Sequence, residues 1–154
     1  MRLSEELAEF IESGVSMLVS TRDAERRPHV LRAVGALIAK DRESLTVYLT
    51  KQIAERAIAN LRDNGKIALT CARPYDHRSM QVKGTLIGMR DGAEADRVQQ
   101  DRYLAGFVEH LYIAGLPRGV IRQLRIFPSV AVTFAAEDAF VQTPGPGAGR
   151  RLEA

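Results

Sequence analysis

LTVYLTKQIAERAIANLRDNGKIALT, residues 45–70, carries the clearest signal of the architecture, because its hydrophobic spacing changes twice. Apolar and polar residues alternate over 45–49, which predicts a strand. Apolar residues then recur with helical spacing over 53–61, and Asn64-Gly65 is a helix stop signal. The β-prone run at 66–72 predicts the next strand. Two strands are therefore expected to be joined here through a helix.

Turn signals on both sides of this stretch separate further strands and helices. The other predicted strands cover residues 15–21, 29–39, 78–89 and 130–134, and the other predicted helices cover residues 3–11, 94–113 and 117–124. Ser4 can cap the first helix and Gly14 can end it. Consecutive strands joined by tight turns pair antiparallel. Five or more such strands with few helices favour a small barrel in an α+β domain.

Length and composition indicate one globular domain. We expect it over residues 1–143 of the 154, followed by a Pro/Gly-rich tail at 144–154. No apolar run approaches the ~20 residues that span a bilayer, and the first residues lack the apolar core of a signal peptide. Cys71 is the only cysteine, which excludes an intrachain disulfide. We therefore expect a cytoplasmic protein without a membrane partner.

The charge and the sequence motifs limit which partners and which kinds of site can be expected. The net charge of +3 gives weak support for an anionic partner, but no basic stripe with interleaved aromatics is present, so nucleic acid is not expected. His29, His77 and His110 lie on three different predicted elements without metal-ligand spacing, so no metal site is expected. Cys71 lies in an apolar strand, which favours a buried structural thiol over a reactive one. Gly-x-Gly-x-x-Gly, Walker-type and Gly-x-Ser-x-Gly patterns are absent from the sequence.

A set of cationic and hydroxyl residues at predicted strand ends is the strongest candidate site. Arg32 lies inside an otherwise apolar strand, Thr50 and Lys51 follow the third strand, and Arg56 lies in the first turns of the next helix. If the strands close into a barrel, these groups can converge on an anion such as a phosphate. The alternatives are solvated surface charges for Lys51 and Arg56, and a structural salt bridge for Arg32.

Three blocks of sequence resemble, in order, the pyridoxamine 5′-phosphate oxidase-like, FMN-binding split-barrel family. They are HVLRAVGALIAKD, then LTVYLTKQIAERAIANLRDNGKIALT, then HRSMQVKG, and the resemblance spans residues 3–88. It implies a small antiparallel split β-barrel of about six strands, of Greek-key type, with flanking helices. It also implies a homodimer with the cofactor at the subunit interface.

The resemblance further implies which residues bind FMN. Arg32, the backbone of Ala33 and Val34, and Thr50 or Lys51 together with Arg56 would hold the phosphate and ribityl chain, and Ser79 and Gln81 would approach the isoalloxazine ring. This chain has Glu55-Arg56-Ala57 where many members have Ser-Arg-Lys, and Leu37 where a lysine is often found. Lys51 is a candidate to supply the missing cation.

Two functions are consistent with this resemblance. The first is an FMN-dependent oxidoreductase acting on a small molecule. The chain lacks the Trp-bearing segment that ends the true vitamin B6 oxidases, so that activity is not expected. The alternative is a non-catalytic flavin carrier, with deazaflavin or haem as less favoured cofactors. The tail would fold over the flavin or a partner subunit, or else be a disordered end; the preceding Phe140 and Val141 can anchor it, which favours contact.

The run PYDHRSMQVKGTLIG, residues 74–88, is polar on one face only. Strand alternation places Ser79, Gln81 and Lys83 on one side, where a flavin ring, a partner subunit or only solvent would lie. Gly84 indicates a close approach of the backbone to another chain or a ligand.

Overall fold

The computed structural model describes residues 1–121 and 124–153, and within these the chain forms six strands, three α-helices and one 3₁₀ turn. The strands are β1 (Ser16–Arg22), β2 (Pro28–Ile38), β3 (Ser44–Thr50), β4 (Lys66–Ala72), β5 (Ser79–Asp91) and β6 (Ser129–Val141). The helices are α1 (Glu5–Glu12), α2 (Glu55–Asn64) and α3 (Glu94–Ile113), and the 3₁₀ turn, η1, is Lys51–Ile53.

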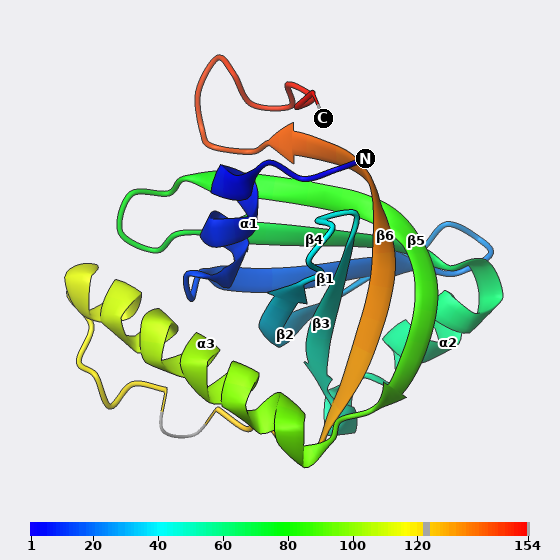
Figure 1. Ribbon diagram of the computed structural model, residues 1–154, viewed down its shortest axis with the longest axis horizontal. Helices are drawn as coiled ribbons and strands as arrows, with labels where there is room; N and C mark the ends of the chain where they lie inside the picture. Colours follow the sequence, from blue (N-terminus) through cyan, green and yellow to red (C-terminus); the bar gives the residue numbers. More distant parts are fainter. Residues whose placement is uncertain (122–123, 154) are drawn as a thin grey trace.

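The strands form a closed antiparallel barrel in the order β1-β2-β3-β6-β5-β4 (Figure 1). The spatial order β4-β1-β2-β3 within it is that of a Greek key. Helix α2 lies between β3 and β4 in the chain, and α3 lies between β5 and β6. The predicted α+β fold with a small antiparallel barrel and flanking helices is confirmed.

Local signals account for several element ends. The Ser4 hydroxyl accepts a hydrogen bond from the Leu7 N–H at 3.2 Å and caps α1. Gly65 ends α2 in the left-handed conformation, with φ of 66°, as the Asn64-Gly65 signal predicts. Strand β4 has the predicted bounds of 66–72.

Two predictions in the last third of the chain differ from the structure. A helix was expected over 117–124, but residues 118–121 form turns, and residues 122–123 lie outside the described part. Residues 117–120 are all exposed, so they offer no buried face to stabilise a short helix. The predicted strand at 130–134 is much longer, because β6 pairs with β5 from Val130 to Val141.

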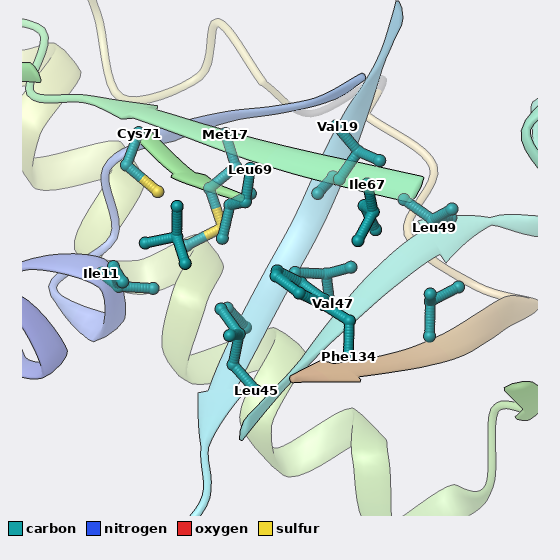
Figure 2. Packing of buried hydrophobic residues seen from close by; sticks show 14 of the residues in the cluster. Ile11, Met17, Val19, Leu45, Val47, Leu49, Ile67, Leu69, Cys71 and Phe134 are labelled. Atoms are coloured by element: carbon teal, nitrogen blue, oxygen red, sulfur yellow. The ribbon is translucent and has the colours of Figure 1, made fainter. Parts of the chain in front are cut away.

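The core fills the inside of the barrel. Figure 2 shows side chains from β1, β3, β4 and β6, with Ile11 of α1, pointing into one interior. Met17, Val19, Val47 and Phe134 are each 0% exposed there, so the barrel has no aqueous channel at this level. The Cys71 side chain is buried in the same cluster, and burial raises the pKa of its thiol, as expected for a structural cysteine.

The chain ends meet at an edge of β6. Strand β3 pairs with β6 only as far as Ala135, so it leaves the second half of β6 unpaired on that side. The tail turns back onto that edge: the Val141 N–H donates to the Arg150 carbonyl and the Leu152 N–H to the Ala139 carbonyl. The amino terminus donates to Ala136 beside it, and both termini lie close together in Figure 1. The tail therefore contacts its own barrel.

Candidate functional site

A cavity of about 250 Å³ lies where β2 and β3 approach the segment that precedes β6. Its lining residues are Arg32, Val34, Thr50, Gln52, Ile53, Leu124 and Arg125. Arg32 lies between the buried residues Leu31 and Ala33 along β2, so strand alternation turns its side chain to the outside of the barrel. Three of the residues implied by the resemblance, Arg32, Val34 and Thr50, thus share one cavity on the outer surface.

Arg32 is held by aromatic and hydroxyl groups. Its guanidinium carbon lies 5.3 Å from the centre of the Phe107 ring, and its Nη1 lies 3.5 Å from the Ser16 hydroxyl. Burial raises the pKa of the nearby Tyr103 to about 12, and the charge of Arg32 opposes that rise. Among the described residues, Arg32 forms no ion pair, so the salt bridge considered for it is not found there.

The segment of residues 124–128 forms the second wall of the cavity. The Thr50 hydroxyl donates to the Arg125 carbonyl at 2.8 Å, and the Lys51 N–H donates to the Pro128 carbonyl at 2.9 Å. Gln100 on α3 is fully buried and donates to the Ile126 carbonyl at 3.0 Å. Segment 124–128 is therefore fixed to both the barrel and α3.

Helix α3 is anchored at its start by Asp96. This carboxylate accepts two hydrogen bonds from Arg90, at 2.6 and 2.9 Å, one from the Ala93 N–H at 2.7 Å and one from the Tyr48 hydroxyl at 3.1 Å. The hydrogen bonds from Arg90 make the largest contribution to lowering the pKa of Asp96 to about 2. Burial raises the pKa of Tyr48 to about 12. These contacts set the position from which α3 presents Gln100 to segment 124–128.

The two other predicted cations lie away from this cavity. Lys51 Nζ lies 2.8 Å from an Asp91 carboxylate oxygen, and Lys51 lines a different cavity of about 320 Å³. Arg56 is more than half exposed and lies 4.0 Å from Asp23. The predicted backbone contact, Ala33, is buried beside Arg32 in β2. Arg32 and Thr50 are thus brought together, and Lys51 and Arg56 are not.

Ser79 and Gln81 lie on the outer face of β5. The Gln81 side chain donates to the Thr70 hydroxyl at 2.9 Å, and the Ser79 hydroxyl donates to the His77 carbonyl at 2.8 Å. Strands β1 and β4 separate β5 from the strand that carries Arg32. The strand register nevertheless connects them, because Leu18 of β1 is the partner of both Arg32 and Thr70, and Thr70 is the partner of Gln81. Arg32, Gln81 and Ser79 thus belong to one outer surface, on which Leu18 is 41% exposed.

Gly84 does mark a close approach, but to the same chain. A Cβ atom at this position would lie 1.8 Å from the carbonyl oxygen of Ala135 in β6, where the β5–β6 register shifts. Glycine is therefore required at position 84 for β5 and β6 to approach this closely.

The described part of the chain contains no cluster of three or more His, Cys, Asp or Glu side chains suited to a metal ion. None of the three histidines is among the residues that line the Arg32 cavity. His110 packs edge-on against Tyr75, and burial, followed by the charge of Arg73, lowers its pKa. The described helices include none long and apolar enough to cross a membrane.

Two polar lining residues, Gln52 and Arg125, were not predicted as site residues from the sequence. Gln52 is adjacent to the predicted Lys51, whereas Arg125 comes from a distant segment and reaches the cavity only through the hydrogen bonds to residues 124–128. The two arginines of the lining fit an anionic group such as a phosphate monoester, whereas the Thr50 hydroxyl already donates to the Arg125 carbonyl.

The family model described as pyridoxamine 5′-phosphate oxidase matches residues 3–138. The chain belongs to this family. Membership in the pyridoxamine 5′-phosphate oxidase family confirms the resemblance found in the three sequence blocks. No curated protein sequence matches the chain.

Solved structures similar to this member of the pyridoxamine 5′-phosphate oxidase family cover most of its length. A Lactobacillus delbrueckii protein, provisionally described as a pyridoxamine 5′-phosphate oxidase, has 16% identity and a TM-score of 0.58, over 91% of this chain and 94% of that one. HupZ of Group A Streptococcus has 17% identity and a TM-score of 0.57, over 96% and 99%. An FMN-binding protein of Syntrophomonas wolfei has 15% identity and a TM-score of 0.52, over 88% and 85%. At these identities the likeness shows the fold alone.

Proposed function

We propose that the chain is an FMN-binding split-barrel protein and a flavin-dependent oxidoreductase acting on a small molecule other than pyridoxamine phosphate. The observation that carries the proposal is the cavity in which Arg32 and Thr50, on neighbouring strands, converge with a second arginine. The described residues that line it include no carboxylate, so an anion would meet no like charge there.

The lining residues suit the phosphate end of FMN. The Arg32 guanidinium can donate to two phosphate oxygens, while the Thr50 hydroxyl, which donates to the Arg125 carbonyl, holds the neighbouring wall of the cavity. Ile53 and Leu124 add apolar wall that can exclude water from the site. Ser79 and Gln81 would contact the ring. FMN supplies hydride and electron transfer when bound, while the protein positions it and its substrate.

A homodimer with the cofactor at the subunit interface forms part of this proposal. Leu18 and Val30 are 41% and 52% exposed on the outer surface that Arg32, Ser79 and Gln81 share. Burying such apolar side chains against a second copy is favourable. Light scattering during size-exclusion chromatography tests the dimer, and a monomeric wild type would contradict this part of the proposal.

Titration of cofactor-free protein with FMN tests the central claim. Flavin fluorescence should change on binding to the wild type, and Arg32→Gln should weaken binding roughly tenfold to hundredfold because a charge-assisted hydrogen bond is lost. Arg102→Gln is the matched control, because Arg102 is an exposed α3 residue outside the cavity lining. A wild-type protein that stays colourless and does not respond to FMN would contradict the proposal. A visible spectrum with haem or deazaflavin absorption would show that the protein binds that cofactor in place of FMN.

A non-catalytic flavin carrier is the second candidate. It is favoured because the residues proposed to contact the flavin ring, Ser79 and Gln81, include no strong general acid or base. A solved structure named F420 reductase, with 14% identity and a TM-score of 0.52, shares the fold, so reduced deazaflavin joins NADH and NADPH as a donor to test. Stopped-flow reduction of the FMN-loaded protein should be fast with one donor. Failure with all three favours the carrier.

A further inference from the structure

We propose that Arg125 is a second phosphate-binding residue of the Arg32 cavity, and that it makes the site selective for a phosphorylated flavin over its dephosphorylated form. The inference rests on the proposed FMN function of the same cavity. Arg125 is far from Arg32 in sequence, and it is the only charged residue of segment 124–128. The two arginines nevertheless line one cavity.

A buried hydroxyl fixes the backbone of Arg125. Thr50 is 5% exposed, and its hydroxyl donates to the Arg125 carbonyl oxygen at 2.8 Å. Thr50 is itself a lining residue of the cavity. One side chain thus forms part of the cavity wall and also fixes the backbone position of Arg125, whose exposed side chain extends from it.

Gln100 anchors the same segment from the other side. Its side chain is 0% exposed, its Nε2 donates to the Ile126 carbonyl at 3.0 Å, and its Oε1 accepts from the Ser129 hydroxyl at 3.4 Å. A buried amide is unfavourable unless its polar atoms are paired, and here both ends pair with the chain on either side of Pro128. Two buried polar side chains therefore position the short segment that carries Arg125.

The charged residues that line the cavity, Arg32 and Arg125, are both positive and favour an anionic ligand. Among the described residues, neither Arg32 nor Arg125 forms an ion pair. A phosphate monoester, with nearly two negative charges at neutral pH, can accept hydrogen bonds from both arginines. Riboflavin carries a neutral hydroxyl in place of that phosphate, so it gains none of this charge interaction.

Parallel titrations of the full chain with FMN and riboflavin test the inference. Arg125→Gln should weaken FMN binding roughly tenfold to hundredfold and leave riboflavin binding unchanged within about twofold. Arg125→Lys keeps the positive charge but lacks the planar guanidinium. Its FMN affinity should therefore lie between those of the wild type and Arg125→Gln. Arg102→Gln serves as the control on α3, and thermal unfolding of each variant checks that it is folded.

The outcomes separate this inference from the function on which it rests. If FMN binds the wild type but Arg125→Gln lowers the affinities for both flavins equally, or changes neither, Arg125 is not a phosphate ligand and the FMN function stands. If the wild type binds neither flavin, the proposed function fails and the role of Arg125 fails with it. A selective loss of FMN binding supports both.

Discussion

Asp96→Asn is expected to destabilise the protein by about 1–2 kcal/mol at neutral pH, and the loss should disappear in acid. The carboxylate of Asp96 is only 9% exposed and accepts hydrogen bonds from Arg90, Ala93 and Tyr48. Its pKa is lowered from 3.8 to about 2. Each pKa unit corresponds to about 1.4 kcal/mol, which sets an upper value near 2.5 kcal/mol. Arg90 is 56% exposed, so solvent screening reduces that value.

The direction of the pH dependence follows from the lowered pKa. The folded protein holds the Asp96 proton more weakly than the unfolded chain does, so this stabilisation is fully present above the ordinary value of 3.8 and is lost as the pH falls toward about 2. Urea unfolding of wild type and Asp96→Asn from about pH 7 to about pH 3 should therefore show converging free energies of unfolding.

A control on the same helix isolates the effect of the buried carboxylate. Asp101 is exposed on α3, and Asp101→Asn should change the free energy of unfolding by less than about 0.5 kcal/mol at every pH. If the gap between wild type and Asp96→Asn is constant with pH, or if Asp101→Asn behaves in the same way, the role assigned to the Asp96 carboxylate is refuted.

Two further predictions concern β5. Gly84→Ala should cost about 1–3 kcal/mol or more in urea unfolding, because the added Cβ meets backbone. Gly88→Ala, where nothing lies within 4 Å, should be near neutral, and equal losses at both sites would contradict the close approach. The double variant Ser79→Ala/Gln81→Ala should weaken flavin binding in the FMN titration with little change in thermal unfolding. Unfolding of that variant would instead mark the pair as structural.

Local sequence signals predicted the first two-thirds of the fold well. The signals at Ser4, at Gly65 and in the alternation over 45–49 act within a few residues. The elements that they determine can therefore be predicted from the local sequence. The later part depends on distant pairing. Ala135 and Ala136 are weak strand formers, yet β5 pairs with them and extends β6 beyond its apolar half. Pro117 gave a helix start signal without any buried face to support it.

The candidate site was predictable only where neighbouring strands supply it. Arg32 and Thr50 meet because β2 and β3 pair, and the register of a hairpin follows from local sequence. Lys51 and Arg56 diverge from them because the chain turns through η1 into α2 directly after β3. Arg125 could not be found from spacing, since its place depends on hydrogen bonds to side chains from β3 and α3.

The return of the tail onto β6 has a consequence for solubility. Residues 149–152 pair with backbone groups of Ala139 and Val141, which lie beyond the end of the β3 pairing at Ala135. An uncovered strand edge of this kind is a template for association with other chains. By occupying these groups, residues 149–152 leave fewer unpaired backbone groups for edge-to-edge association, whether or not a ligand is bound near Arg32.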